Sequence, residues 1–279
     1  MTTPGILYIV ATPIGNLDDV STRGINTLKS VAVIAAEDTL HSQRLLRHLQ
    51  ISTPLVSCHQ HNEAARTQEL ITRLQQGDSV AIISDAGTPL ISDPGERLVI
   101  AAQAAGIKVV PIPGPCALIA ALSASGLVVT PFIFLGFLPA KSTARKVMIE
   151  HYQLRTETLV LYEAPHRILD LITDLLQLLG PDREVVIARE LTKQFETIHR
   201  DSLAKLLDWL QADPNQQRGE FVVVVAGAET QAAAADDTTV IETLKILLSE
   251  CSLKQAVKLA SQLTKTAKNK VYDLALTLK

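Results

Sequence analysis

The sequence predicts an α/β protein with two α/β domains, a cleft between them and a small helical domain at the C-terminal end. From residue 6 to residue 226, apolar runs of strand length alternate with segments of helical periodicity, as in a largely parallel sheet covered by helices. The pattern restarts after Gly126, which indicates a second domain with a more mixed sheet. We expect domains at 1–118 and 119–228, a linker at 229–239 and a basic, helix-turn-helix-like module at 240–279.

The first domain opens on a continuous apolar run at residues 6–12, which is typical of a strand buried on both faces. Further apolar runs predict strands at 31–36, 54–58, 79–83 and 108–112. Helical periodicity predicts helices at 41–49, 62–76, 96–105 and 117–125.

In the second domain we expect strands at 132–137, 158–162, 184–188 and 221–226, with 195–199 pairing beside the third of them. Helices are expected at 142–152, 166–179 and 203–210. The low-complexity stretch AETQAAAADDTT (228–239) reads as a linker. Three short helical patterns follow it, with Ser252 and Thr266 as the expected N-caps of the second and third.

Composition restricts the class of protein. Hydrophobic residues make up 47% and charged residues 20% of 279 residues, which predicts a globular, soluble chain. No apolar run reaches the roughly 18 residues that span a bilayer, and the N-terminal sequence lacks a signal-peptide pattern. Three widely spaced cysteines fit a reducing cytoplasm. The net charge of −3 means that any nucleic-acid binding must come from a local basic surface.

Such a surface is available in the tail. From Cys251 onward the chain has six lysines and one acidic residue, Asp273. A solvated helix face is the ordinary explanation of such a run. Three short helices with this charge in an otherwise acidic protein favour a module that contacts phosphates.

Three loops rich in glycine and proline follow predicted strands, at residues 13–16, 84–95 and 113–116. The longest, SDAGTPLISDPG, far exceeds the roughly 2–6 residues of an ordinary α/β connection. Open α/β sheets bind ligands at the carboxyl ends of their strands. We therefore expect the three loops to form one wall of a ligand-binding crevice.

Polar groups also gather where predicted strands end, at residues 37–39, 163–167 and 189–193. Each group has a structural explanation: Asp38 or Glu163 could cap a helix, and Arg189 could simply pair with Glu190. Their repetition in both domains favours a cleft in which acids and bases face a substrate.

Several other motifs are excluded or weak. No G-x-G-x-x-G follows the first strand, and the stretch 136–142 lacks the second glycine of a phosphate loop. Cys58, His59 and His61 lack a second ligand cluster, so we expect no metal. A nucleophile elbow is absent. Lys141, Arg145 and Lys146 form a small basic cluster that could meet a polyanion or lie on an exposed helix face.

Eight ordered blocks resemble the tetrapyrrole-methylase superfamily and, within it, the ribose 2′-O-methyltransferases of small-subunit ribosomal RNA. They are ATPIGNLDD (11–19), AAEDT (35–39), SDAGTPLISDPG (84–95), PIPGPCALIAALSASG (111–126), GFLPAK (136–141), YEAPHR (162–167), ARELTK (188–193) and GEFVVVV (219–225). The match spans both α/β domains, and the lysine-rich tail is similar to that family's helix-turn-helix-like domain. Leu40 departs from the pattern, because the family commonly has a basic residue there.

The resemblance implies a homodimer that binds S-adenosyl-L-methionine in the cleft and methylates a cytidine ribose in the decoding region of 16S rRNA, within the small ribosomal subunit. The implied cofactor contacts are Pro13, Gly15, Asp85, Gly87, Thr88, Pro89, Pro115, Cys116, Ala117, Tyr162, Glu163 and Ala164.

Attack by a ribose hydroxyl requires removal of its proton, which a carboxylate, lysine or histidine can accept. The candidates, in no fixed order, are Glu37, Asp38, His166, Glu190 and Lys193. The candidate RNA contacts are Arg23, Lys141, Arg145, Lys146, Arg167, Arg189, Lys254, Lys258, Lys265, Lys268 and Lys270. Two alternatives stay open: a small-molecule methyltransferase that acts on a tetrapyrrole carbon, and a cofactor-binding regulator without catalysis.

Overall fold

The computed structural model describes residues 3–229 and 237–278. Two compact units account for them: the larger comprises residues up to 153 and 157–226, and the smaller comprises 154–156 and the described residues from 227 onward. Most of the expected linker, residues 230–236, lies outside the described residues, and the expected domain boundaries stay predictions.

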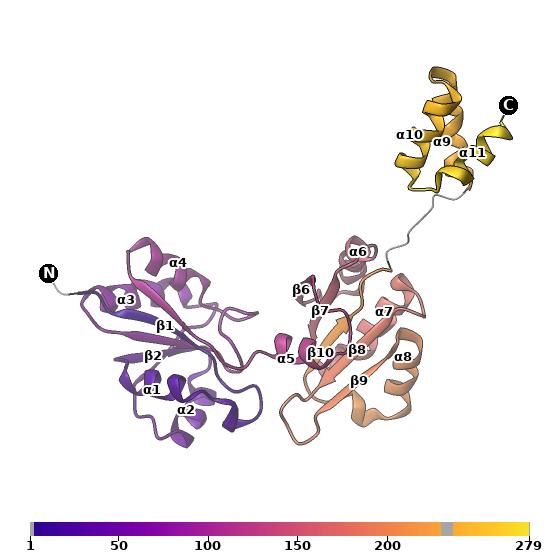
Figure 1. The fold of residues 1–279 in the computed structure, drawn as a ribbon. Helices are drawn as coiled ribbons and strands as arrows, with labels where there is room; N and C mark the ends of the chain where they lie inside the picture. The colour runs from indigo at the N-terminus through magenta and orange to yellow at the C-terminus, as the bar shows by residue number, and fades with distance from the viewer. Residues whose placement is uncertain (1–2, 230–236, 279) are drawn as a thin grey trace. The chain divides into compact units, whose positions relative to one another are not determined.

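The first sheet of the larger unit is entirely parallel, with strand order β3-β2-β4-β1-β5 (Figure 1). Its strands are β1 (Ile6–Val10), β2 (Val33–Ala36), β3 (Leu55–Ser57), β4 (Val80–Ile83) and β5 (Lys108–Ile112). Helices α1 (Thr22–Ser30) and α2 (Thr39–His48) pack on one face, and α3 (Glu63–Gln75) and α4 (Glu96–Ala104) on the other. Cover on both faces explains why these strands read as continuous apolar runs.

The strand order places the candidate loops side by side. Parallel strands end at the same edge of a sheet, and β1 lies between β4 and β5. The three loops rich in glycine and proline therefore emerge next to one another, and the segment after β2 emerges beside the segment after β4.

One helix was not expected from the sequence. Helix α1 begins after Ser21, whose Oγ accepts a hydrogen bond from the Gly24 backbone N–H at 3.0 Å. Only Ile25 and Leu28 among its nine residues are large apolar side chains, so the periodic signal is short.

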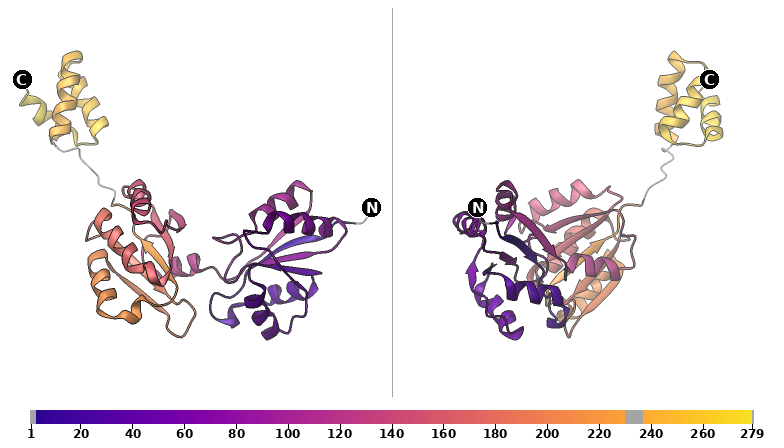
Figure 2. Two further views of the ribbon diagram at one scale, coloured as in Figure 1. Left: turned by 180° about the vertical axis from the view of Figure 1, so that it is seen from behind. Right: turned by 60° about the vertical axis from the view of Figure 1, so that its left-hand side comes forward.

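The second sheet is mixed, with strand order β6-β7-β10-β8-β9. Its strands are β6 (Phe132–Phe137), β7 (Thr158–Glu163), β8 (Glu184–Arg189), β9 (Thr197–Ser202) and β10 (Phe221–Val225). Helix α5 (Ala117–Ala124) packs on one face, and α6 (Ser142–Tyr152), α7 (Ile168–Leu179) and α8 (Leu203–Ala212) pack on the other (Figure 2). Only β6 and β7 pair in parallel.

Strand β9 begins two residues later than expected. Phe195 and Glu196 belong to the turn before it, where the Phe195 carbonyl accepts a hydrogen bond from Arg189 and the Glu196 backbone N–H donates to the Lys193 carbonyl. Both groups are therefore used to hold the turn and are not available for sheet pairing.

The described part of the smaller unit contains three helices, α9 (Asp237–Glu250), α10 (Leu253–Thr264) and α11 (Lys268–Leu276). They enclose a separate core of Val240, Leu244, Val257, Ala260, Val271 and Ala275. Ser252 caps α10 as expected, and its backbone N–H donates to Gln255 Oε1 at 3.3 Å. The expected cap at Thr266 is wrong: Ala267 holds that position, and the Thr266 hydroxyl donates to the Thr264 carbonyl.

Across the described residues, no helix has both the length and the apolar character needed to cross a membrane.

Candidate active site

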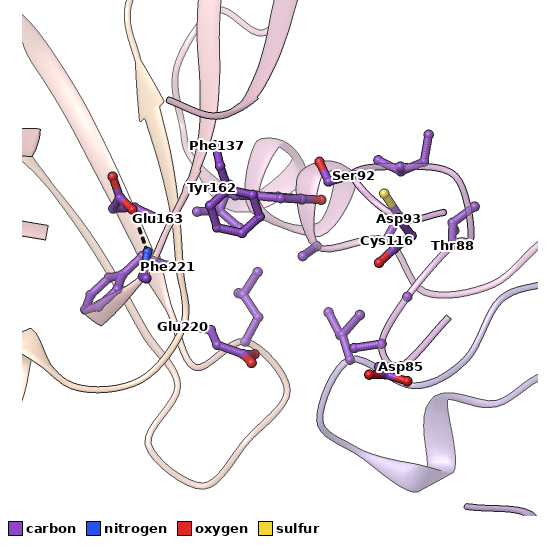
Figure 3. Close-up of a pocket in the computed structure, with 18 of the residues that line it drawn as sticks. Asp85, Thr88, Ser92, Asp93, Cys116, Phe137, Tyr162, Glu163, Glu220 and Phe221 are labelled. Carbon is purple, nitrogen blue, oxygen red and sulfur yellow. Dashed lines mark hydrogen bonds between the residues drawn. The ribbon is translucent and has the colours of Figure 1, made fainter. Parts of the chain in front are cut away.

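A cavity of about 490 Å³ opens where the loops after β1, β2, β4 and β5 meet the end of the second sheet (Figure 3). Phe137 and Tyr162 contribute aromatic rings to one side, and Asp85 and Thr88 lie across from them. Such a volume suits a ligand of nucleoside size.

Backbone pairing holds two of the loops together. Thr12, at the end of β1, exchanges hydrogen bonds with Gly87 across an isolated antiparallel bridge, with N···O distances of 2.9 and 3.1 Å. The Thr88 hydroxyl then donates to the Pro115 carbonyl at 2.9 Å, which ties in the third loop. The three loops therefore form one hydrogen-bonded wall, as the sequence led us to expect.

Backbone strain in this wall is concentrated next to the cavity. Leu90 and Ser92 have φ of 73° and 70°, a region that side chains other than glycine rarely adopt. Gly95 has φ of 122° and donates its N–H to the buried Glu63 carboxylate at 3.2 Å. Left-handed residues of this kind gather at ligand sites because the surrounding structure fixes them.

The cavity is lined by acids. Of the described residues that line it, Glu37, Asp85, Asp93, Glu163 and Glu220 are carboxylic acids, and none is Lys, Arg or His. A cavity of this character favours a cationic ligand over an anionic one.

Two of these acids hold protons more tightly than usual. Burial raises the pKa of Glu37, the negative charges of Asp85 and Asp38 raise it further, and His59 partly opposes them. Burial, followed by the charges of Glu37 and Asp85, raises the pKa of Asp93 to about 7. A positive charge in the cavity would relieve this repulsion.

The raised pKa of Asp93 predicts a pH-dependent stability. The folded protein binds this proton up to about pH 7, whereas an ordinary aspartate has a pKa of 3.8. Stability is therefore lost as pH rises from about 4 to 7, because ionisation costs more in the folded state. We expect Asp93→Asn to gain about 1–2 kcal/mol over wild type between pH 5 and pH 8, after discounting for solvent screening.

Urea denaturation at pH 5 and pH 8 tests this expectation. Asp170→Asn, at an exposed position on α7, serves as the control. A stability difference between wild type and Asp93→Asn that does not change with pH would contradict the role given to Asp93.

Lys193 forms ion pairs beside the cavity and contacts the lining residue Glu220. Lys193 Nζ lies 2.9 Å from Glu190 Oε1 and 3.0 Å from Glu220 Oε2. Its side chain covers Gly15, where an added Cβ would lie only 2.5 Å from Lys193 Cγ. The turn after β1 therefore needs a glycine at this position to leave room for the lysine.

The hydrogen bonds among Lys193, Glu190 and Glu220 stabilise the charged forms of Lys193 and Glu190. Burial lowers the pKa of Lys193, but the hydrogen bonds to Glu190 and Glu220 outweigh it and raise the pKa overall. For Glu190, burial raises the pKa, and the bonds from Lys193 and the Glu220 backbone N–H outweigh it and lower the pKa overall. At neutral pH the lysine is thus an ammonium ion and Glu190 a carboxylate.

On the aromatic side, the Tyr162 hydroxyl accepts a hydrogen bond from the Leu118 backbone N–H at 3.1 Å. Its ring meets those of Phe134 and Phe137 edge-on, at centroid distances of 4.9 and 5.6 Å. Burial, followed by interaction with Cys116, raises the pKa of Tyr162 to about 12, so the phenol stays protonated.

Comparison with known proteins explains this arrangement. The family model for tetrapyrrole (corrin/porphyrin) methylases matches residues 6–207, and a model described as the RsmI C-terminal HTH domain matches residues 233–279. This chain belongs to the tetrapyrrole methylases. The methylase match covers the first sheet and strands β6 to β9 of the second sheet, whereas β10 and the lining residues Glu220, Phe221 and Val222 lie beyond it.

Full-length relatives place the chain within one branch of these methylases. A protein of Pseudomonas aeruginosa named ribosomal RNA small subunit methyltransferase I is 54% identical over 98% of this chain and 97% of its own length. A protein of the same name from Escherichia coli O157:H7 is 46% identical over 98% and 95%. The chain is therefore a methyltransferase of the ribosomal RNA small subunit methyltransferase I family.

Two solved structures share the fold with this chain at low sequence identity. Uroporphyrin-III-C-methyltransferase from Thermus thermophilus is 22% identical with a TM-score of 0.56, over 80% of this chain and 94% of that one. Diphthine synthase is 17% identical with a TM-score of 0.63, over 80% and 90%. The predicted α/β fold is thus confirmed.

Eight of the residues expected to contact the methyl donor line the cavity of this methylase: Asp85, Gly87, Thr88, Cys116, Ala117, Tyr162, Glu163 and Ala164. Pro13, Gly15, Pro89 and Pro115 lie next to lining residues but do not line the cavity themselves. Their roles as cofactor contacts stay predictions.

The candidate bases are spread over four places. Glu37 lines the cavity, whereas Glu190 and Lys193 pair with each other beside it. Asp38 caps α2, and its Oδ1 accepts hydrogen bonds from Leu40 and His41 at 2.8 and 3.1 Å, which lower its pKa. His166 is exposed and does not line the cavity.

Two predicted RNA contacts are wrong. Arg145 is only 2% exposed and forms an ion pair with the buried Asp174 at 2.6 Å. Arg189 is only 7% exposed and donates to the carbonyls of Arg218 and Phe195 and to the Thr197 hydroxyl. Both guanidinium groups hold the second α/β layer together and cannot reach a polyanion.

The other side chains predicted to contact RNA differ in their exposure and in whether they are paired with an acidic group. Lys146 shares Asp174 at 3.4 Å, and Arg167 donates to the Leu138 carbonyl and lies 3.2 Å from Glu163. Arg23 and Lys141 are exposed in the larger unit. In the smaller unit Lys254, Lys258, Lys265 and Lys268 are exposed, whereas Lys270 pairs with Asp237 at 2.7 Å.

Sequence reasoning did not single out Asp93 or Glu220. Asp93 belongs to the 84–95 loop, where it is the second aspartate. Glu220 precedes β10, which runs antiparallel to β7 and β8, so its start lies at the edge where those strands end. A residue just before an antiparallel strand lies at the same edge as the residues that follow its neighbours, and this is the signal by which Glu220 could have been predicted.

The described residues contain no cluster of three or more potential metal ligands.

Burial, followed by the charge of Glu63, raises the pKa of Cys58 to about 11, so this thiol stays protonated.

Proposed function

We propose that this methyltransferase uses S-adenosyl-L-methionine to methylate the ribose 2′-oxygen of a cytidine in the decoding region of 16S rRNA, within the small ribosomal subunit. The observation that carries the proposal is the full-length similarity to ribosomal RNA small subunit methyltransferase I, in a chain whose cavity is lined by acids. The block resemblance in the sequence supports the finer assignment to a cytidine 2′-hydroxyl.

The residues of the cavity fit the methyl donor. When bound, S-adenosyl-L-methionine supplies an electrophilic methyl group on a positively charged sulfur. Glu37, Asp85 and Asp93 offer the negative charge that a cation requires. Gly87 has φ of 85°, which favours glycine, and a Cβ there would lie 3.2 Å from Ile14 Cγ2, so this part of the cavity wall has little room for a side chain.

Water exclusion and orientation follow from the apolar lining. Ile14, Phe137 and Leu191 line the cavity together with the Tyr162 ring. An apolar surround strengthens the interaction between the carboxylates and a cation, and it keeps competing water away from a reactive methyl group. Proximity of the reacting groups is then the main contribution of the protein.

Among the candidate bases, Glu37 fits best. A base must be able to take up a proton, and the raised pKa of Glu37 makes it a stronger acceptor than an ordinary carboxylate. Lys193 is already protonated, and hydrogen bonds stabilise the ionised forms of Glu190 and Asp38. In the proposed reaction Glu37 accepts the 2′-hydroxyl proton as the O–CH₃ bond forms and the S–CH₃ bond of the donor breaks, which leaves a neutral thioether.

RNA contacts are proposed for cations that are exposed. In the larger unit these are Arg23 and Lys141, and in the smaller unit they are Lys254, Lys258, Lys265 and Lys268. Their charge attracts the phosphate backbone without regard to sequence. A methylase acting on a tetrapyrrole has no need for such a module, which favours RNA over that alternative substrate.

We also propose that the protein is a cytoplasmic homodimer. The family resemblance supports the dimer, and three free cysteines without a disulfide partner among the described residues are compatible with a reducing compartment.

Transfer of labelled methyl groups to small ribosomal subunits that lack their own modification tests the function. We expect label on a single cytidine 2′-oxygen, mapped by nuclease digestion and mass spectrometry. Label on a base, or no label on subunits or free rRNA despite tight binding of the donor, would overturn the proposal. Label on a tetrapyrrole would favour the alternative substrate class.

A further inference from the structure

The smaller unit has a surface groove that the methyl-transfer site does not use. Val257 of α10 and Lys268, Asn269, Tyr272 and Asp273 of α11 line it. Both helices belong to the same compact unit, so the groove is defined without reference to the α/β sheets.

The only aromatic residue of this unit's C-terminal segment lies in the groove and not in the core. Residues 227–279 contain one aromatic side chain, Tyr272. The neighbouring Val271 is fully buried, whereas Tyr272 is 46% exposed. Ile246, Leu263 and Leu276 of this unit are exposed as well, but Tyr272 lines the groove and offers a ligand an aromatic face there.

One cation lies beside the ring. Lys268 lines the groove one helical turn before Tyr272 on α11, and Lys254 lies one turn before the groove residue Val257 on α10. Both lysines are exposed. Among the acids on the helices of this unit, Asp237, Glu242 and Glu250 lie on α9, and Asp273 lies on α11, where it lines the groove.

The polar groups of the groove suit a base better than a bare phosphate. Asp273 would repel a phosphate, but its oxygens can accept hydrogen bonds from an exocyclic amino group. Asn269 adds one acceptor and two donors. An aromatic face flanked by donors, acceptors and cations is the composition with which proteins hold an unstacked base of single-stranded RNA.

We propose that this groove binds one unstacked nucleotide of single-stranded RNA, with an amino-bearing base against Tyr272 and the neighbouring phosphates beside Lys254 and Lys268. The proposal rests on the proposed function for its choice of RNA as partner. It adds a second RNA site, separate from the methylation cavity.

Fluorescence anisotropy with the full chain tests the site. The probes are fluorescein-labelled r(C)₁₂, r(U)₁₂ and a 12-base-pair RNA duplex. Tyr272→Leu removes the ring and keeps its apolar character, and we expect r(C)₁₂ binding to weaken about tenfold. Tyr272→Phe keeps the ring and is expected to bind within about twofold of wild type.

Further variants test the charge of Lys268 and the contact between Asp273 and the base separately. Lys268→Gln is expected to weaken binding and to reduce its salt dependence by about one unit in the log–log slope. Lys245→Gln removes the same charge from an exposed position on α9 and is the matched control. Asp273→Asn is expected to reduce the preference for r(C)₁₂ over r(U)₁₂.

The outcomes separate this site from the proposed function. Equal r(C)₁₂ binding by wild type and Tyr272→Leu, or tighter binding of the duplex than of either single strand, would overturn the groove assignment. Methyl transfer to small subunits, measured with the same variants, then shows whether the enzyme still modifies rRNA. Loss of a groove contact with retained transfer at saturating substrate supports a binding role alone.

Discussion

Replacing Glu37 with glutamine is expected to lower the rate of methyl transfer by about 10²- to 10⁴-fold, the usual contribution of a general base. Glutamine keeps the shape of the side chain but cannot take up the proton of a ribose hydroxyl. The measurement is single-turnover transfer of labelled methyl groups to unmodified small subunits, with donor affinity determined in parallel by calorimetry. We expect donor binding to persist, because Asp85 and Asp93 still line the cavity.

The neighbouring carboxylate provides a matched control. Asp38→Asn makes the same chemical change one residue away, and asparagine is as good an N-cap as aspartate. Since the Asp38 side chain caps α2 through Leu40 and His41, we expect near wild-type transfer from this variant. Full activity of Glu37→Gln, or a large loss in Asp38→Asn alone, would move the proton acceptor away from Glu37.

The position of the site could be read from the sequence because it depends on the backbone. Glycine and proline interrupt the chain where a strand must end, and parallel strands end at one edge. The composition of the stretch 84–95 was therefore enough to predict that it borders a ligand-binding cavity. The order of the strands was not predictable, and it is this order that places β1 between β4 and β5 and brings its turn against Gly87.

Whether an individual lysine or arginine is exposed or buried was much harder to predict. A sequence shows that Lys141, Arg145 and Lys146 are close in the chain, but it does not show which of them faces the interior. Arg145 points to Asp174, which lies 29 residues further along the chain. Arg189 likewise meets carbonyls of two separate turns. Such partners depend on how distant elements pack, and no local pattern encodes them.

Helix α1 was missed because its local sequence signal is weak. Its sequence, TRGINTLKS, has a glycine in the first turn and only two large apolar residues. Intrinsic propensity and periodicity are both weak over so short a segment. Burial of Leu28 against the first sheet, together with the Ser21 cap, provides the stabilisation. Tertiary packing decides the outcome where the local signal is small.

Replacing Arg145 with methionine is expected to lower the free energy of unfolding by about 3–5 kcal/mol, because it leaves a buried carboxylate without its main partner. Arg145 Nε and one terminal nitrogen lie 2.7 and 2.6 Å from Asp174 Oδ2, and both side chains are almost fully buried. The loss should fall toward the lower end of that range, since Ser142 and Lys146 still contact Asp174. Urea denaturation followed by circular dichroism measures the effect.

Two further variants decide between a structural and an RNA-binding role for this arginine. Lys141→Met removes a charge from the same short cluster at an exposed position, and we expect a change in stability of no more than about 0.5 kcal/mol. Adding Asp174→Leu to Arg145→Met removes the unpaired charge, so the double variant should recover part of the lost stability. An Arg145→Met protein as stable as wild type but weaker in RNA binding would restore the surface role, because a buried ion pair cannot be broken without a thermodynamic cost.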